Sequence, residues 1–227
     1  YIYIAKRFLS SVNDTGKFTS IISIVGICIG SFALVISISV LNGFENKLDE
    51  KISNFDGHFK ISGLNQNYDL TKLRSIESIT DMSFSIDRKG IIKNNINEAL
   101  VTFKQLDFDK LMSFYNIPFV GDISDDNKIL IGNDIASRLG LSIGDEVVIS
   151  SPLDQNSIFG FPSTVKTYIS GIFFSKILDY DNRYILISNK IGNKIFYNNS
   201  NLPSLNVKIS DVSKVEVVKT KAANILD

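Results

Sequence analysis

The stretch IISIVGICIGSFALVISISVL, Ile21–Leu41, decides the fold class of this 227-residue chain. It holds only apolar residues and small Ser and Gly, and no charged residue lies between Lys17 and Glu45. A helix needs about 20 such residues to cross the hydrocarbon core of a bilayer. The apolar part of a cleaved signal peptide is shorter, about 7–15 residues. We therefore expect a transmembrane helix over residues 18–44, and we disfavour a buried core helix or a signal peptide.

Small residues form a stripe along this expected helix. Their steps alternate between three and four positions, which places them on one helical face: Ser23, Gly26, Gly30, Ala33 and Ser37. Glycine is a poor helix former in water, but in a membrane small residues let two helix backbones approach closely. The spacing predicts packing against a partner helix. The alternative is chance, because glycine is frequent in membrane helices.

The charges that flank the helix predict its orientation. Basic residues outnumber acidic ones before it, in residues 1–17, whereas acidic residues outnumber lysines directly after it, in residues 45–50. Positive charge stays on the cytoplasmic side of a membrane. We expect the N-terminus to be cytoplasmic and the residues after Phe44 to lie outside the cell membrane. Residues 1–17 alternate aromatic, aliphatic and basic side chains, which is typical of an interfacial segment.

The part after Phe44 predicts a mixed domain. FENKLDEKISNF, Phe44–Phe55, keeps a helical apolar spacing, so the membrane helix is expected to continue as an amphipathic stalk. Further helices are expected at 68–79, 134–139 (ended by Gly140) and 212–227, and strands at 57–63, 82–88, 89–92, 99–104, 146–150, 165–174, 183–188 and 206–211. The fold class is α+β. Helix–strand pairs at the two ends predict an α/β part from residues 45–100 and 200–227, with a β-rich insertion at 101–199.

Sequence motifs of catalysis are lacking. The single histidine, His58, precedes an expected strand and is interpreted as a structural hydrogen-bonding residue. There is no CxxC, HExxH or P-loop motif, and the single cysteine, Cys28, lies inside the apolar run. Charge is balanced, with 24 Lys+Arg and 24 Asp+Glu, which disfavours nucleic-acid binding. We expect no catalytic residue, no metal site and no cofactor.

The segment SSPLDQNSIFGFPST, Ser150–Thr164, is expected to be an irregular loop, yet it is apolar where loops are normally polar. Its candidate partner-binding residues are Pro152, Leu153, Ile158, Phe159, Gly160, Phe161 and Pro162. Exposed apolar clusters mark binding sites, so one interpretation is an arm that recruits a partner. The alternative is a compact loop that folds its phenylalanines back over its own sheet. The residues alone favour neither.

Three phrases together resemble a known family. IAKRFLSS (Ile4–Ser11) with the membrane run and its VLNGFE exit (Val40–Glu45), GHFKISG (Gly57–Gly63), and IGNDIASRLGLSIGDEVVI (Ile131–Ile149) are similar to lipoprotein-releasing ABC transporter permeases of the LolC/LolE type. These belong to the wider MacB- and FtsX-like permeases. The resemblance covers essentially the whole chain. The chain departs from the family at two places. Members of the family often have proline before the histidine, where this chain has Gly57, and the residue types of the apolar loop also differ.

The resemblance implies a helix in the bacterial inner membrane followed, after Phe44, by a MacB-like periplasmic domain, with a "porter" part from both ends of the segment and an inserted "sabre" part. It implies that the chain is the N-terminal half of a permease with three further membrane helices. The implied partners are a separate ATP-binding subunit, a second identical or homologous permease subunit, membrane lipid, a lipoprotein substrate and a LolA-like carrier. In LolC-like members a "hook" loop recruits this carrier, and Ser150–Thr164 resembles that hook.

Two rival functions remain open. One is another MacB- or FtsX-like permease that drives efflux or regulates a cell-wall hydrolase. The other is a single-pass anchored binding or sensor domain that transports nothing. Three further apolar runs of about 20 residues beyond Asp227 would indicate a permease.

Overall fold

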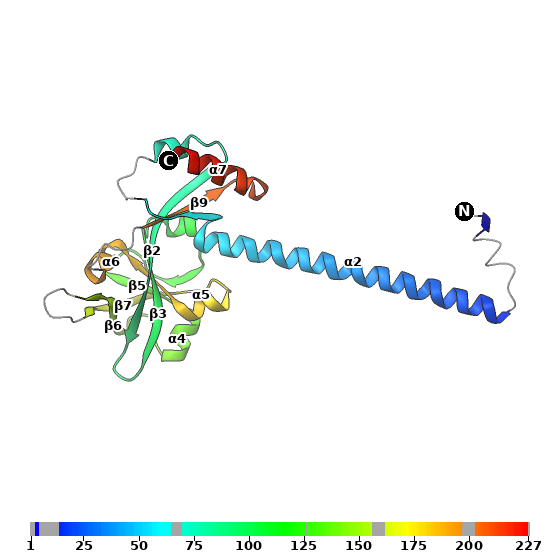
Figure 1. The fold of residues 1–227 in the computed structure, drawn as a ribbon. Helices are drawn as coiled ribbons and strands as arrows, with labels where there is room; N and C mark the ends of the chain where they lie inside the picture. Colours follow the sequence, from blue (N-terminus) through cyan, green and yellow to red (C-terminus); the bar gives the residue numbers. More distant parts are fainter. Residues whose placement is uncertain are drawn as a thin grey trace. The chain divides into compact units, whose positions relative to one another are not determined.

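The computed structural model describes residues 3–4, 14–64, 70–125, 127–155, 162–196 and 203–226, with side chains in the first helix described from Phe18 onward. The chain divides into two compact units, Tyr1–Asp49 and Glu50–Asp227. Helix α2 (Asp14–Asp56) makes up most of the first unit, and its last turns belong to the second. Figure 1 shows this helix in blue and the mixed second unit in cyan to red.

Helix α2 is long and apolar enough to cross a membrane. Its large apolar side chains are exposed; Ile27 is 69% and Phe32 68% exposed. A core helix of a soluble protein would bury such side chains, so the buried-helix alternative is wrong for the described residues. The helix continues without interruption to Asp56, which confirms the expected continuation beyond Phe44. Most of the interfacial segment expected at residues 1–17 lies outside the described residues.

The second unit consists of one nine-stranded sheet with helices packed on it. Its strands are β1 (Phe59–Ile61), β2 (Ile79–Lys93), β3 (Glu98–Leu106), β4 (Phe119–Gly121), β5 (Lys128–Gly132), β6 (Glu146–Gln155), β7 (Pro162–Phe173), β8 (Tyr184–Ser188) and β9 (Ser204–Ile209). Its helices are α3 (Thr71–Arg74), the π-helix η1 (Leu111–Tyr115), α4 (Asn133–Leu139), α5 (Leu178–Arg183), α6 (Asn189–Ile195), the 3₁₀-helix η2 (Val212–Lys214) and α7 (Val215–Leu226).

Six of the strands close into a ring of pairings. Strand β2 pairs with β3, β3 with β8, β8 with β5, β5 with β7, β7 with β6, and β6 again with β2. The β3–β8 and β5–β7 pairs are parallel and the others antiparallel. A closed ring removes the free edges that make open sheets prone to misassociation.

The central strands are buried on both faces. In β5 and β8 the outer residues of the ILI triplets join one apolar cluster, with α4 and α6. The middle residues, Leu130 and Leu186, join a second cluster with Phe55, η1 and Phe173. Successive strand side chains point to opposite faces, so three consecutive apolar residues serve both clusters. This explains why these strands are short, continuous apolar runs.

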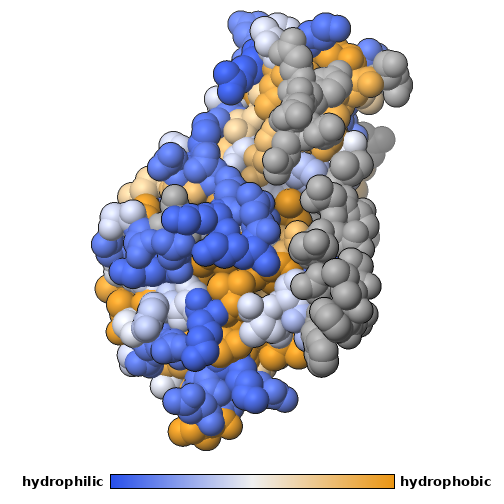
Figure 2. Space-filling model, turned by 90° about the vertical axis from the view of Figure 1, so that its left-hand side faces the viewer, coloured by the Kyte–Doolittle hydropathy of each residue, from blue (hydrophilic) through white to orange (hydrophobic). Residues whose placement is uncertain are grey.

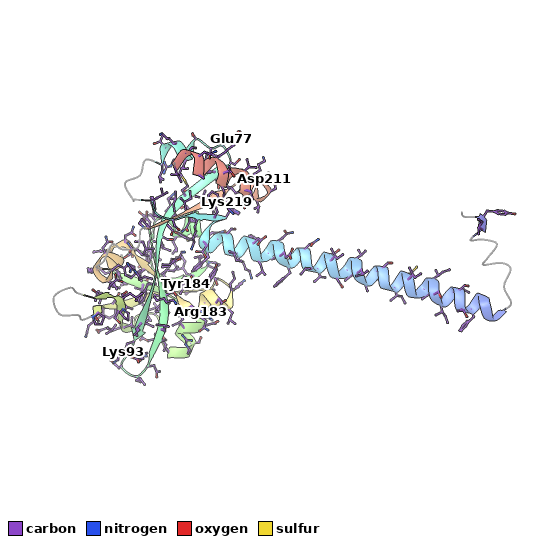
Figure 3. All side chains as sticks on the ribbon, viewed as in Figure 1. Glu77, Lys93, Arg183, Tyr184, Asp211 and Lys219 are labelled. Carbon is purple, nitrogen blue, oxygen red and sulfur yellow. The ribbon has the colours of Figure 1, made fainter. Side chains whose placement is uncertain are left out.

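A third apolar cluster joins the two ends of the second unit. It combines Phe59, Leu73 and Met82 with Leu205, Val207 and Val218. Strand β2 is long enough to pair with β9 through Ile79–Ser85 and with β6 near its other end. Figure 3 places Lys93 at the β2–β3 turn, far from Glu77, Asp211 and Lys219 at the α7 end. One strand thus connects the third cluster to the ring.

Several local predictions are confirmed. Helix α4 ends at Gly140, whose φ of 64° is left-handed, and β6 begins at Glu146 after the expected turn. The segments expected at 99–104, 165–174, 183–188 and 206–211 are strands β3, β7, β8 and β9. The helix expected at 212–227 is η2 followed by α7.

Other local predictions are wrong. The helix expected at 68–79 is only Thr71–Arg74 among the described residues, because β2 already begins at Ile79 to pair with β9. The two strands expected at 82–88 and 89–92 are one strand, since pairing with β3 continues through Gly90. Helices η1, α5 and α6 were not expected; they are one or two turns long, too short for a clear apolar period.

Candidate functional site

The described parts of the apolar segment, residues 150–155 and 162–164, are two paired strands of a β-hairpin rather than an irregular loop. Strand β6 extends to Gln155 and β7 begins at Pro162, and these two residues are paired. Between the Ser151–Ser163 pair and this last pair, β6 holds three extra residues, Pro152–Asp154, which form a bulge. Local sequence gave no alternation here because the bulge interrupts the period of two.

The hairpin carries the residues predicted to bind a partner. Pro152 and Pro162 are exposed, and Leu153 is 65% exposed on the bulge. The predicted residues Ile158, Phe159, Gly160 and Phe161 lie outside the described residues. The arrangement therefore brings the two prolines and Leu153 together at the described end of the hairpin.

A buried ion pair fixes the root of this hairpin. The Asp154 carboxylate lies 3.4 Å from the Arg88 guanidinium on β2, and both side chains are buried. The Ser151 hydroxyl donates a hydrogen bond to Asp154 over 2.5 Å. Breaking a buried pair by removing one partner costs about 3–5 kcal/mol. The bulge is thus held to β2 by Asp154 while the neighbouring Leu153 faces outward.

The end of α2 forms a second candidate site, within the second unit. Phe55 is fully buried and stacks on Tyr180, with ring centroids 4.0 Å apart and planes at 15°. Its ring also meets Tyr184 edge-on at 5.0 Å. The chain then turns at Gly57, whose φ of 74° suits glycine and whose added Cβ would lie 2.9 Å from the Val207 carbonyl oxygen. An aromatic side chain and a tight turn therefore fix the last turn of α2.

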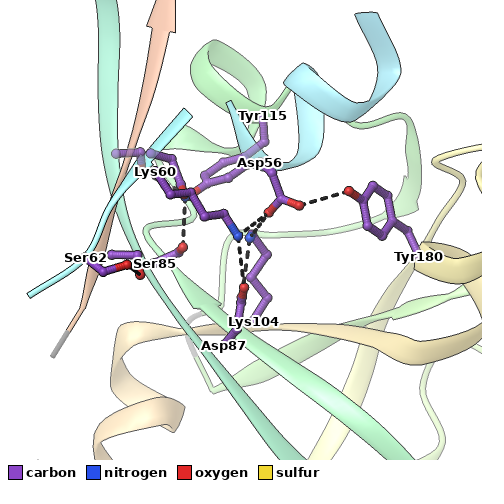
Figure 4. A network of polar contacts seen from close by, with 11 residues as sticks. Asp56, Lys60, Ser62, Ser85, Asp87, Lys104, Tyr115 and Tyr180 are labelled. Carbon is purple, nitrogen blue, oxygen red and sulfur yellow. Dashed lines mark hydrogen bonds and ion pairs between the residues drawn. The ribbon is translucent and has the colours of Figure 1, made fainter. Parts of the chain in front are cut away.

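Charged side chains complete this junction (Figure 4). The Asp56 carboxylate lies 2.7 Å from the Lys104 ammonium and 2.8 Å from that of Lys60, and it accepts a hydrogen bond of 2.9 Å from Tyr180. Asp87 contacts the same two lysines, at 3.1 Å from Lys60 and 3.4 Å from Lys104. A carboxylate at the C-terminal end of a helix is disfavoured by the helix dipole. The lysines of β1 and β3 offset this cost.

The network shifts the pKa values of its members. Burial alone would raise the pKa of Asp56, but the charges of Lys104 and Lys60 outweigh it and lower that pKa to about 2. Burial would lower the pKa of Lys60, but Asp87 and Asp56 raise it above its ordinary value. Burial and the charge of Asp56 raise the pKa of Tyr180. At neutral pH Asp56 and Lys60 are therefore charged, which suits a structural latch rather than proton transfer.

A neutral polar cluster lies behind this network. The Tyr115 hydroxyl donates to Ser83 over 3.2 Å, and the Asn206 amide donates to Ser85 and Tyr115. Burial raises the pKa of Tyr115 to about 12. His58 has the structural role expected of it, since its Nδ1 accepts a hydrogen bond of 3.2 Å from the Ile209 backbone N–H. In the described part of the chain, His, Cys, Asp and Glu form no group of three that suits a metal ion.

The turn between β2 and β3 is a further exposed apolar feature. Ile96 is 88% exposed there, and Figure 2 shows apolar surface at this lower end of the second unit. The Asn94 side chain accepts a hydrogen bond of 2.9 Å from the Ile96 N–H and donates one of 3.2 Å to the Leu139 carbonyl. The turn is therefore tied to the end of α4.

The small-residue stripe of α2 meets nothing in the described residues. A Cβ added at Gly26 or Gly30 would have no heavy atom within 4 Å. The Ser23 hydroxyl donates to the Thr19 carbonyl over 2.9 Å, within its own helix. Sequence reasoning did not single out Asp56, Lys104, Arg88 or Asp154. A usable signal was the charge of Lys104 inside the apolar strand ALVTFKQL.

Comparison with known proteins identifies relatives over nearly the full chain. It is 30% identical over 240 residues to the lipoprotein-releasing system transmembrane protein LolC of Buchnera aphidicola subsp. Schizaphis graminum, covering 99% of this chain and 59% of that protein. It is 22% identical over 231 residues to LolC of Neisseria meningitidis serogroup B, covering 92% and 54%. The chain thus spans less than two thirds of the length of these curated relatives.

A solved structure shares the fold. The periplasmic region of MacB from Actinobacillus actinomycetemcomitans matches with a TM-score of 0.50 and 12% identity, over 73% of this chain and 74% of that one. Residues 20–225 match the family model described as MacB-like periplasmic core domain. These matches confirm the α+β class and the resemblance to LolC-type permeases. The chain belongs to the family of MacB-like periplasmic core domains.

Proposed function

We propose that this chain is the N-terminal part of the permease subunit of an ABC transporter that releases lipoproteins from the inner membrane to a periplasmic carrier. The observation that carries this proposal is the 30% identity to a LolC protein over 99% of the chain. A membrane-length helix followed by a MacB-like domain is the architecture that such a permease requires. Neither a catalytic motif nor a P-loop is present in the sequence, so ATP hydrolysis is assigned to a separate subunit.

In this proposal residues 18–44 cross the inner membrane and residues after Phe44 are periplasmic. The porter-like part comprises residues 45–100 and 200–227, and the sabre-like insertion comprises 101–199. The apolar cluster that combines Phe59, Leu73 and Met82 with Leu205 and Val218 supports a part built from both ends. The ring of strands that includes β5, β6, β7 and β8 supports a β-rich insertion.

The end of α2 has a mechanical role in the proposal. ATP hydrolysis on the cytoplasmic side must act on a periplasmic domain, and α2 is the segment of this chain that extends from the apolar run to that domain. Phe55 and Asp56 attach its last turn to β1, β3 and α5 through ring stacking and ion pairs of 2.7–2.8 Å. A displacement of this turn is therefore passed to the sheet rather than absorbed by a flexible linker.

The β6–β7 hairpin is the proposed site for a LolA-like carrier. Its root is fixed by Arg88 and Asp154, and its bulge exposes Leu153. Exposed apolar side chains on a fixed hairpin lose little conformational freedom when a partner covers them. Phe159 and Phe161, which lie outside the described residues, complete the proposed apolar contact.

Photo-crosslinking in cells tests the carrier site with the complete permease. A photoreactive residue at position 153 is expected to crosslink to a LolA-like carrier, whereas one at Val217, also exposed but on α7, is not. Burial of one phenylalanine contributes about 1.5–3 kcal/mol, so Phe159→Ala or Phe161→Ala is expected to lower carrier affinity about tenfold or more. Equal crosslinking at both positions, or reduced thermal stability with unchanged affinity, would reject the hairpin as the carrier site.

A separate experiment tests the transport function. Depletion of the permease in cells should leave lipoproteins in the inner membrane, and the complete permease should restore their release. Normal release during depletion, with failed export of another substrate or failed cell-wall hydrolysis, would assign the chain to another MacB- or FtsX-like permease. If the segment after Asp227 lacks further membrane helices, the chain is an anchored binding domain instead.

A further inference from the structure

We propose that a cavity beside the last turn of α2 binds the phosphate-containing headgroup of an anionic phospholipid. The cavity has a volume of about 260 Å³ and is lined by residues that include Lys51, Asn54 and Phe55 from α2, Asn116 and Ile117 after η1, and Lys176 before α5. All of these residues belong to the second unit. The proposal is separate from carrier recruitment and lipoprotein release.

Backbone strain is concentrated in the walls of this cavity. Among the described residues, the non-glycine residues with positive φ are Asn116, at 43°, and Lys176, at 60°, and both line it. Glycine is the unstrained residue for such a conformation, and strained residues cluster at functional sites. The buried Asp181 carboxylate holds the Lys176 conformation, since it accepts hydrogen bonds from the backbone N–H groups of Ser175 and Lys176 over 2.7 and 3.0 Å. The fold therefore keeps a lysine where a glycine would fit more easily.

The charges of the cavity favour an anion. The ammonium groups of Lys51 and Lys176, which both line the cavity, have no carboxylate partner within the described ranges. Among the described residues the Lys51 ammonium donates to the Lys176 carbonyl, over a long 3.5 Å. Asn54 accepts a hydrogen bond of 3.0 Å from Lys208, which leaves its amide NH₂ group able to donate. A phosphate bearing no nearby positive charge of its own suits these donors better than a zwitterionic headgroup.

The lining also holds apolar groups. Pro118, which is exposed, and Phe174, which is half-buried, border the cavity together with the buried Phe55 and Ile117. An inorganic ion gains nothing from apolar groups, whereas the glycerol and upper acyl carbons of a lipid bury apolar surface against them. A lining that holds both cationic and apolar groups matches an amphiphile.

The position of Lys51 favours a lipid from the surrounding membrane. Lys51 follows Phe44 by seven positions of continuous helix, which is about 10 Å of helix length. Side chains on a helix point back toward its N-terminus, here toward the apolar run, and lysines reach headgroups in this way. A headgroup near Phe44 would therefore lie within reach of the Lys51 side chain along the same helix.

Lipid binding to the detergent-solubilised chain, followed by native mass spectrometry, tests the proposal. Phosphatidylglycerol is expected to give one adduct per chain at concentrations where phosphatidylcholine gives none. Lys51→Gln is expected to weaken that adduct about fivefold, as is typical of one lysine at an anionic lipid surface. Lys47→Gln, which removes an exposed charge one turn closer to the apolar run, is the matched control and is expected to leave it unchanged.

Lys176→Gly keeps the test valid if other variants unfold. It removes the ammonium group and relieves the positive φ, so the adduct should weaken about fivefold while the melting temperature does not fall. A diacylated lipopeptide without phosphate should not compete with phosphatidylglycerol, which separates this site from the lipoprotein substrate. Equal binding of phosphatidylcholine, equal loss with Lys47→Gln, or displacement of the lipid by glycerol phosphate alone would overturn the proposal.

Discussion

Helix α2 has two regions whose apolar side chains meet opposite surroundings. Within Ile21–Leu41 the large apolar side chains are exposed in the chain, whereas Phe55, in the last turn of the same helix, is fully buried between aromatic rings. Charges are distributed in the opposite way, absent from the first region and densely paired around Asp56. The first region relies on lipid to cover it and the second on protein. The same residue type therefore contributes to stability by different routes along one helix.

The largest expected effect is the loss of the Phe55 ring. Truncating a buried phenylalanine costs about 3–5 kcal/mol, so Phe55→Ala is expected to lower the melting temperature of the second unit by about 10 °C. Phe32→Ala removes the same ring from the exposed region and should leave that temperature unchanged. Near-UV circular dichroism of the chain in detergent follows both. Equal decreases in melting temperature for the two variants would contradict the conclusion that protein covers Phe55 but not Phe32.

Two ion pairs outside α2 test whether the burial of a charged pair decides how much it contributes to stability. Asp154→Asn leaves the buried Arg88 guanidinium without its carboxylate, at an expected cost of about 3 kcal/mol in unfolding free energy. Lys166→Gln breaks a highly exposed pair with Glu146 and should cost less than about 1 kcal/mol. Urea unfolding of both variants gives the two values. A cost for Lys166→Gln as large as that for Asp154→Asn would contradict this distinction.

The pH dependence of Asp56 gives a smaller effect. Its pKa of about 2 lies below the ordinary value, so its stabilising contribution is present above about pH 4 and is lost as the pH falls toward about pH 2. Asp56→Asn is expected to reduce the unfolding free energy by about 2 kcal/mol at neutral pH. The difference from the unaltered chain should shrink toward zero near pH 2 in urea titrations. A constant difference at every pH would assign the effect to packing rather than to charge.

The smallest expected effect on folding concerns the stripe of small residues. A Cβ added at Gly26 or Gly30 has no heavy atom within 4 Å outside the neighbouring helix backbone, so leucine at both positions should leave melting of the second unit unchanged. Such bulk is nevertheless expected to separate α2 from a neighbouring helix and to weaken co-purification with the other transporter subunits. Leucine at Ile27 and Ile29 provides the control with nearly unchanged volume. Unaltered co-purification of the glycine variants would make the stripe incidental.

The regions of α2 also differ in how well the sequence predicts them. The membrane run is evident from a single local property, an unbroken apolar segment, and the end of α4 is evident from Gly140. Phe55 follows the apolar spacing of the stalk, so its burial fits that pattern. The network around Asp56 is different, because its members come from α2, β1, β2, β3 and α5 and meet only through the strand order.

The β6–β7 hairpin was also only partly predictable from the sequence. The apolar residues of Ser150–Thr164 were visible, but the strands that present them were not, because the Pro152–Asp154 bulge breaks the alternation. Asp154 looks like an ordinary loop acid in the sequence. Its burial depends on Arg88, sixty-six positions earlier and on another strand. Chemistry that depends on residues distant in sequence could not be predicted from local patterns.

The pairing of β1 with β9 sets the order in which the domain is completed during synthesis. Phe59 pairs with Val207, and Met82 on β2 pairs with the same residue, so β1 and the Ile79–Ser85 part of β2 lack this partner until the ribosome has made β9. At about 5–20 residues per second, that delay is on the order of ten seconds. During it, the edge of β1 and the Ile79–Ser85 edge of β2 stay open. The nascent domain therefore needs protection from misassociation at the very segment that follows its membrane helix.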